Sequence, residues 1–235
     1  LGYMVGKRVG NAVPYFKGLT TVYNLQPSTF NLKTLGAAMA ASGAVALYHV
    51  EGVTPEAETE IISPNAETIV VESLSEGYAA LNSPVERIDL VSIGCPHASL
   101  AEIEEVARWL EGKRVKAALW VTTARRTREL AEERGFVQTI EAAGGRVLAD
   151  TCLVVAPVEA LGFRSLATNS AKMAFYAPSH CGLAVRFGSL EQCLEAAVRG
   201  SWTAKGDHEI RERGPRNTRK GMKSAKVFRA FREVS

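Results

Sequence analysis

Two cysteines, Cys95 and Cys152, each follow a short apolar run that has the length and the flanking residues of a buried strand. In open parallel sheets, ligands bind at the carboxyl ends of the strands, so thiols far apart in sequence can face one cavity. Thiolates are the ligands that iron–sulfur clusters and zinc prefer. The placement therefore favours a metal-cluster enzyme. The alternative for each cysteine is that it only fills space in the core.

The residues beside the two thiols could support such chemistry. His97 lies in the strand-to-helix loop that carries Cys95, and Ser99 precedes the next helix. His97 could transfer a proton, or its ring could simply bond to the backbone. Ser99 is typical of a helix N-cap, and helix N-termini also bind anions. Asp150 could orient the second thiol loop, or it could form an ordinary turn.

The spacing of the four cysteines argues against a closed zinc site. No Cys-x-x-Cys pair occurs in the sequence, and Cys181 and Cys193 offer no such spacing either. Cys193 lies among Leu190, Leu194 and Val198 in a helical pattern, which indicates core packing. Cys181 lies in a loop before a strand and stays ambiguous.

Two further strand-to-helix junctions carry polar groups that could bind an anion. At the first, Thr168 or Asn169 could cap the helix while Ser170 and Lys172 hold a phosphate or a carboxylate. At the second, Arg125 could bind an anion through two hydrogen bonds. The alternatives are an ordinary capped helix and a surface arginine. All four junctions would lie on the carboxyl side of one sheet.

The elements that position these residues alternate between helical and extended patterns. This alternation predicts right-handed βαβ units and an α/β fold whose sheets are mainly parallel, with helices on both faces. The expected helices are 32–42, 73–82, 99–111, 124–143, 169–176 and 189–199. The expected strands are 44–50, 68–71, 88–93, 115–121, 146–149, 152–156, 164–167 and 183–187.

Composition places the chain among ordinary globular proteins. Of its 235 residues, 46% are hydrophobic and 23% are charged. No apolar stretch approaches the roughly 20 residues that span a bilayer, and no secretory signal opens the sequence. We therefore expect a cytoplasmic protein with free or metal-bound thiols and no membrane partner. The first residue is Leu1, which leads us to expect the C-terminal portion of a longer polypeptide.

The last 35 residues form a basic segment. Residues 201–235 hold ten lysines and arginines against four acids, so this segment carries +6 and the rest of the chain −3. Such a segment could contact nucleic-acid phosphates, and a cluster-free nucleic-acid-associated protein is the alternative function of another class. No zinc-finger or RNA-binding signature accompanies the charge, so we favour a solvated extension and expect no nucleic-acid partner.

Several of these motifs, taken together, resemble the aconitase X family in order and spacing, from about residue 4 to residue 200. The resemblance is strongest to the C-terminal half of the family's large subunit. It rests on the segments 35–45, 49–56, 93–99, 150–152, 167–172 and 185–191.

The resemblance implies an aconitase-like fold and an iron–sulfur hydro-lyase, with a 4Fe–4S cluster favoured over 2Fe–2S. It implies dehydration of mevalonate 5-phosphate to trans-anhydromevalonate 5-phosphate in the mevalonate pathway of isoprenoid biosynthesis. The alternative within the family is dehydration of cis-3-hydroxy-L-proline. Either substrate would be a small phosphorylated or carboxylated molecule.

The family pattern also implies roles for residues of this chain. Cys95 and Cys152 match two of three cluster ligands, and His97 and Lys172 are the expected catalytic residues. The third ligand would come from an N-terminal half of the large subunit, and a small swivelling subunit would supply a serine base, so the enzyme would be a heteromer. The expected substrate-binding residues are Ser99, Arg125, Thr168, Asn169, Ser170, His49 and Glu51.

For the domains, the resemblance implies that residues 1–200 are the C-terminal part of the catalytic region. We expect this part to contain two α/β subdomains, roughly 30–150 and 151–200 plus 1–29. Residues 201–235 would be the basic extension.

Overall fold

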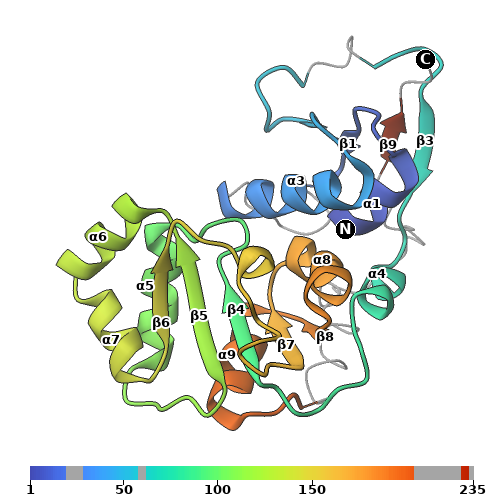
Figure 1. Cartoon of the computed structure of the whole chain (residues 1–235). Helices are drawn as coiled ribbons and strands as arrows, with labels where there is room; N and C mark the ends of the chain where they lie inside the picture. Colours follow the sequence, from blue (N-terminus) through green and yellow to red (C-terminus); the bar gives the residue numbers. More distant parts are fainter. Residues whose placement is uncertain (20–28, 58–61, 204–228, 233–235) are drawn as a thin grey trace, which may run out of the picture. The chain divides into compact units, whose positions relative to one another are not determined.

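The computed structural model describes residues 1–19, 29–57, 62–203 and 229–232. The chain divides into two compact units (Figure 1). The first consists of Leu1–Tyr78 with Arg213–Ser235, and the second of Ala79–Glu212. We expected a boundary near residue 150, but strands from both sides of that position belong to one sheet, and the units divide after Tyr78. Most of the basic segment lies outside the described residues.

The second unit is built on a five-stranded sheet in which every neighbouring pair is parallel. Its strand order is β6-β5-β4-β7-β8, which Figure 1 shows from left to right. This confirms the predicted parallel α/β architecture. The strands are β4 (Leu90–Ile93), β5 (Ala118–Thr123), β6 (Arg146–Ala149), β7 (Ser165–Thr168) and β8 (Ala184–Phe187).

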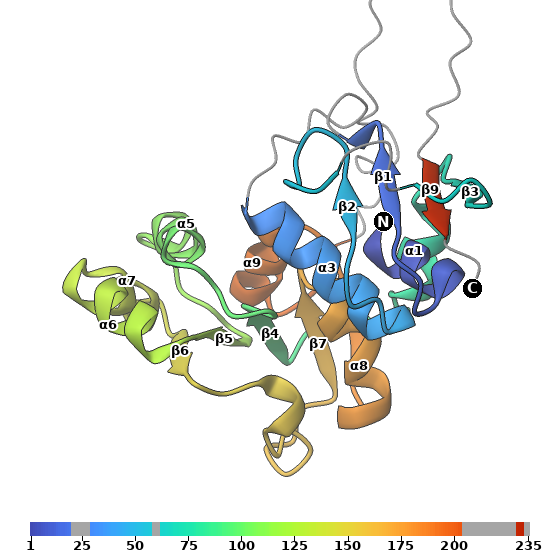
Figure 2. The same ribbon diagram turned by 90° about the horizontal axis from the view of Figure 1, so that it is seen from above.

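Helices cover both faces of this sheet, as the alternation predicts. One face packs into the main core with α5 (Leu100–Leu110), α7 (Phe136–Ala142) and α9 (Leu190–Arg199). On the other face lies α8 (Ala171–Cys181), which contacts β7, β8 and the short turn η2 (Leu153–Val155). Figure 2 shows α5 and α9 on one side of the sheet and α8 on the other. Helix α6 (Arg125–Glu133) follows β5.

Residues along β4 show why the sheet is buried on both faces. Val91 and Ile93 belong to the main core cluster, while Leu90 and Ser92 alternate with them and are also buried. Strands covered on both faces have apolar runs without alternation, which is the pattern seen in the sequence at 88–93.

The first unit contains helices, two of which (α1 and α3) pack together, and a small mixed sheet. Its helices are α1 (Gly2–Val9), α3 (Thr29–Gly43) and α4 (Ser75–Ala80), which begins in this unit and runs past its last residue. The sheet has the order β2-β1-β9-β3, with β1 (Tyr15–Lys17), β2 (His49–Val50), β3 (Glu67–Val70) and β9 (Arg229–Arg232). Strand β2 is parallel to β1, whereas β9 is antiparallel to both of its neighbours.

Glycines permit the close approach of α1 and α3. A Cβ atom on Gly43 would collide with the backbone of Gly6, and one on Gly6 would crowd the backbone of Met39. The contact buries Met4, Val5, Val9 and Met39 in a second core cluster. None of the helices in the described ranges is long and apolar enough to cross a bilayer.

Three predicted elements were wrong. Only His49 and Val50 of the expected strand 44–50 pair with another strand, because Ala44 turns the chain at φ 59° and the Tyr48 hydroxyl donates to Leu32 O of α3. The expected helix 124–143 is divided into α6 and α7 by Gly135, which has φ 79°. The expected strand 152–156 is the turn η2.

Candidate active site

Four loops of the second unit leave the sheet at the same edge. Strands β4, β5, β6 and β7 are parallel neighbours, so their carboxyl ends lie together. The loops that follow them carry Cys95 after β4, Arg125 after β5, Cys152 after β6 and Asn169 after β7. Strand β5 separates the two strands that precede the thiols. The topology therefore places both thiol loops at one edge, as the sequence predicted.

The first thiol loop is attached to β5 by hydrogen bonds. The Thr122 hydroxyl donates to Gly94 O (2.7 Å), the Thr123 hydroxyl donates to Ala98 O (2.6 Å), and Ala98 N donates to Thr122 O (2.9 Å). Gly94 has φ 93°, and a Cβ atom there would collide with Thr122 O. The loop therefore needs glycine at this position, both for its left-handed backbone and for this close approach.

Ser99 serves as the N-cap of α5. Its hydroxyl accepts from Glu102 N, and the Glu102 carboxylate accepts from Ser99 N (2.9 Å) and the Ser99 hydroxyl (2.8 Å). This is a capping box, in which both side chains satisfy helix-end donors. The capping alternative weighed for Ser99 is thus what the structure contains, and its hydroxyl is engaged within the helix start.

The second thiol loop is anchored by Asp150. Asp150 has φ 53°, and its amide donates to Thr123 O at the end of β5 (3.0 Å). Its carboxylate accepts from Arg125 N (2.9 Å) and Arg125 Nε (2.8 Å) at the start of α6. These two bonds from Arg125 lower the pKa of the Asp150 carboxyl. The guanidinium expected to bind substrate is therefore paired with Asp150.

A hydrogen bond joins the two thiol loops. His97 Nε2 lies 2.9 Å from Thr151 O, the carbonyl oxygen immediately before Cys152. Because a carbonyl oxygen only accepts, Nε2 is the protonated ring nitrogen in this contact. His97 thus connects the Cys95 loop to the Cys152 loop, and any proton transfer by its ring from this position would use Nδ1.

Both cysteines at this edge, Cys95 and Cys152, are half-buried. Cys181, at the end of α8, is buried, and its pKa is raised first by burial and then by the neighbouring Cys152 and Glu159. Cys193 is fully buried in the main core, as its helical pattern indicated, and burial raises its pKa strongly.

The β7–α8 junction uses two of its hydroxyls internally. The Ser170 hydroxyl accepts from Met173 N (3.1 Å) and so caps α8, while the Thr168 hydroxyl accepts from Ser170 N (3.2 Å). The cap is therefore Ser170, not Thr168 or Asn169 as expected, and both hydroxyl residues are buried. Asn169 and Lys172 are half-buried.

His49 and Glu51, two of the expected substrate-binding residues, belong to the first unit. His49 lies on β2, with its ring centroid 6.4 Å from that of Tyr15, and its Nδ1 atom is buried without a hydrogen-bond partner. Glu51 Oε1 forms a long ion pair with Lys17 Nζ (3.9 Å).

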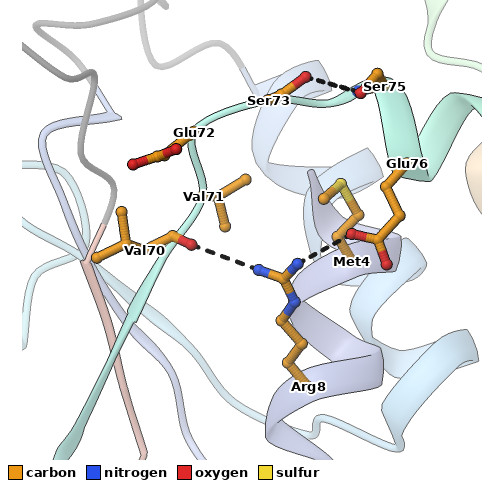
Figure 3. A pocket seen from close by; sticks show the side chains of 8 residues that line it. All are labelled: Met4, Arg8, Val70, Val71, Glu72, Ser73, Ser75 and Glu76. Carbon is orange, nitrogen blue, oxygen red and sulfur yellow. Dashed lines mark hydrogen bonds and ion pairs between the residues drawn. The ribbon is translucent and has the colours of Figure 1, made fainter.

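The first unit also contains an open cavity of about 340 Å³ beside the end of β3 (Figure 3). Arg8 of α1 crosses one side of it, pairing with Glu76 (3.1 Å) and donating to Val70 O (3.5 Å). The residues that line it are Met4, Arg8, Val70, Val71, Glu72, Ser73, Ser75 and Glu76. Because Arg8 is already paired with Glu76, the cavity lacks the unpaired charge of an anion site.

The donors of the second unit fit part of an iron–sulfur site. Two thiols lie in loops at one edge of the sheet, and thiolates are the ligands that such clusters require. Within the described ranges, no three histidine, cysteine or acidic residues form a group that could hold a metal ion. The described residues therefore offer two thiol donors and not a complete ligand set.

Two domain models of one family match the chain. The aconitase X second domain matches residues 1–76, and the aconitase X third domain matches residues 88–199. The chain belongs to the aconitase X family. The two matches follow the two structural units closely, and the second covers every strand of the parallel sheet.

Curated aconitase X relatives are dehydratases by name. The phosphomevalonate dehydratase large subunit of Methanocaldococcus jannaschii is 47% identical over 198 residues, which are 83% of this chain and 48% of that protein. The subunit of the same name from Thermococcus kodakarensis is 45% identical over 84% of this chain and 50% of that protein. The cis-3-hydroxy-L-proline dehydratase of Pseudomonas aeruginosa is 39% identical over 85% of this chain and 36% of that protein.

A solved structure of an aconitase X protein shares the fold. The crystal structure of Thermococcus kodakaraensis aconitase X in its holo-form matches 83% of this chain and 50% of that chain, with a TM-score of 0.75 and 43% identity. The aconitase-like fold is thereby confirmed. The chain spans about half the length of the large subunits it matches.

Proposed function

We propose that this chain is the C-terminal half of an aconitase X dehydratase large subunit that removes water from mevalonate 5-phosphate to give trans-anhydromevalonate 5-phosphate. The relatives named for phosphomevalonate dehydration support this assignment, since four of them are 41–47% identical to the chain. The two relatives named for cis-3-hydroxy-L-proline are 36% and 39% identical.

The observation that carries the proposal is the connection between the two thiol loops. His97 Nε2 and Thr151 O form a hydrogen bond that ties Cys95 and Cys152 to one edge of the parallel sheet. Ligands of open α/β sheets bind at this edge. A chain that used these thiols only for packing would have no need to link the two loops there.

The thiolates of Cys95 and Cys152 would be the chain's ligands to an iron–sulfur cluster. When bound, a 4Fe–4S cluster with one open iron position supplies a Lewis acid for a leaving hydroxyl group. The half-burial of both thiols suits this role, because a ligand must be accessible from the cavity and partly shielded from water. A third ligand from the other half of the large subunit would complete the set.

The other residues of the edge would bind and orient the substrate. The N-terminus of α8 favours an anion, and Lys172 in its first turn adds a positive charge for a phosphate or carboxylate. Asn169 can donate from its amide. Ser99, Thr168 and Ser170 are capping or turn residues, so their contribution would be to fix the starts of α5 and α8 rather than to offer hydroxyls to the substrate.

The remaining assignments concern the proton and the partners. His97 would hold or pass a proton at Nδ1, and Lys172 would stabilise developing negative charge. His49 and Glu51 would be substrate-binding residues contributed by the first unit. The relatives are named large subunits, which implies a small subunit, and we assign to that partner the serine base that removes the proton. We place the assembled heteromer in the cytoplasm.

The test is reconstitution. The chain is combined with the other half of the large subunit and the small subunit, and product formation is followed by NMR with mevalonate 5-phosphate or cis-3-hydroxy-L-proline. We expect turnover only from the complete mixture and only with the phosphorylated substrate. In that mixture, Cys152→Ser should abolish activity and cluster absorbance, whereas Cys193→Ala should retain both. Turnover by this chain alone, or an unaffected Cys152→Ser protein, would contradict the proposal.

A further inference from the structure

The sheet of the first unit has a strand in its middle that comes from the far end of the chain. Strand β9 (Arg229–Arg232) lies between β1 and β3 and pairs with both. The register aligns Ala230 with Phe16 on one side and with Ile69 on the other. In the described part of the chain, this strand is the only hydrogen-bonded connection between β1 and β3 within the sheet.

Contacts besides those with β9 also hold β1 and β3 in place. Phe16 of β1 and Ile69 of β3 pack into the same core cluster as Met4 and Val5 of α1. Arg8 of α1 also donates to Val70 O at the end of β3. Because neighbouring strands lie about 4.8 Å apart, β1 and β3 stand roughly 10 Å apart, which is the width of one missing strand. Without β9, β1 and β3 would flank a slot with two unpaired backbone edges.

The comparisons separate β9 from the rest of this sheet. Strands β1, β2 and β3 all lie within the residues matched by the aconitase X second domain, 1–76. Strand β9 lies outside both family matches, which end at residue 199. The strands on either side of the slot thus lie in the region that the family model matches, whereas the strand that fills the slot in this chain lies outside it.

We infer that the slot between β1 and β3 accepts a strand from the half of the large subunit that this chain does not match, and that β9 occupies it in that strand's absence. An open slot would leave rows of N–H and C=O groups unpaired, which proteins avoid. The matched large subunits are about twice as long as the aligned region, so they contain a further half that can supply the strand. This inference rests on the proposed function for the identity of the partner.

The inference has a specific consequence for binding. A strand from the partner must displace β9, so weakening β9 should strengthen the association. Proline at Ala230 removes a backbone donor from the middle of β9 and disfavours a central strand position. A matched control is Ser235→Pro, which introduces proline three residues after the strand ends.

The test measures binding to the unmatched half of the Thermococcus kodakarensis large subunit, immobilised on a sensor surface. We expect Ala230→Pro to bind about tenfold more tightly than the unaltered chain and Ser235→Pro, because one or two ladder hydrogen bonds no longer compete. A synthetic peptide of residues 226–235 should compete with the partner for the Ala230→Pro chain, and a scrambled peptide should not.

A second measurement needs no substitution. Hydrogen exchange of the unaltered chain should show that amides 229–232 lose protection when the partner is added, while amides of β1 and β3 keep theirs. Equal affinity of all three chains, absence of binding, or continued protection of 229–232 in the complex would each overturn the inference. None of these measurements uses catalytic turnover, so the result for strand displacement does not depend on whether the proposed dehydratase activity is found.

Discussion

The ring nitrogen Nε2 of His97 lies 2.9 Å from the carbonyl oxygen of Thr151, and the two residues come from loops that follow β4 and β6. This single contact crosses the end of β5 and connects the segments that carry Cys95 and Cys152. It gives His97 a structural task in addition to the chemical one we assign to it, and the two can be separated experimentally.

His97→Ala should loosen the arrangement of the two thiols. A neutral hydrogen bond contributes about 1 kcal/mol, so we expect roughly a fivefold loss of affinity for phenylarsine oxide, a reagent that bridges two neighbouring thiols. Binding is measured by titration of the purified chain. His180→Ala is the control, because His180 contacts Ser179 and Tyr176 within its own helix. An equal loss in both variants would argue against the link between the loops.

Asp150→Ala should release the second thiol loop from the start of α6. The substitution removes both carboxylate contacts to Arg125 and leaves alanine at φ 53°, a left-handed conformation that alanine disfavours. We expect faster alkylation of Cys152, measured by mass spectrometry. Glu129→Ala removes an ion pair with Arg126 on the same helix and should leave that rate unchanged.

Gly94→Ala should destabilise the second unit much more than Gly112→Ala does. Both glycines have positive φ, at 93° and 69°, but only a Cβ atom on Gly94 would meet another residue, namely Thr122. The backbone conformation alone costs about 1 kcal/mol, and the collision should raise the cost at Gly94 by a further 1–3 kcal/mol. Urea unfolding of the two variants measures the difference. Similar midpoints would contradict the close approach.

The free energy of unfolding of the second unit should decrease as the pH is lowered, in part because of Asp89. Burial raises the pKa of this carboxyl, but hydrogen bonds from Arg164 N and from Ser165, together with Arg87, lower it more, so the net pKa is below the usual 3.8. The carboxylate therefore contributes stability above pH 3.8, and this contribution is lost as the pH falls through the lower folded pKa.

The matching experiment compares unfolding of the unaltered chain and Asp89→Asn at several pH values. The difference in free energy of unfolding should be largest near neutral pH and should shrink below about pH 4. A difference that grows on acidification would have the wrong sign for a carboxyl with a lowered pKa.

The four thiols should differ in reactivity. Burial raises the pKa of Cys193 and, with the charges of Cys152 and Glu159, that of Cys181, and only the thiolate reacts. Native alkylation near pH 8 should therefore label Cys95 and Cys152 before the other two. Rapid labelling of Cys193 would show that its helix does not pack as described.

Local sequence signals predicted much of the second unit. The strand 146–149 agrees with β6, and the amphipathic helix 99–111 agrees with α5 to within one residue at each end. Both have complete local signals, with a capping serine for α5 and a glycine pair before β6. The prediction was wrong where one residue changed the outcome, as at Gly135, where a left-handed turn divides the expected helix.

Relationships between distant residues could not be derived from local patterns. The sequence indicated Arg125 as an anion ligand, but its partner Asp150 follows the adjacent strand, and only the sheet order brings them together. The contact between His97 and Thr151 arises in the same way. The pairing of β9 with β1 and β3 joins segments more than 150 residues apart, so the basic segment gave no local sign of it.

Strand β5 acts as a spacer between the two thiol-bearing strands. Since adjacent strands are about 4.8 Å apart, β4 and β6 end roughly 10 Å from each other, so the two thiols can approach one another only through the loops that follow these strands. Whatever both thiols bind must lie above the end of β5, where Ala124 begins the turn into α6. Ala124 is small and exposed, so we expect a bulky residue there to obstruct the proposed site without replacing either cysteine.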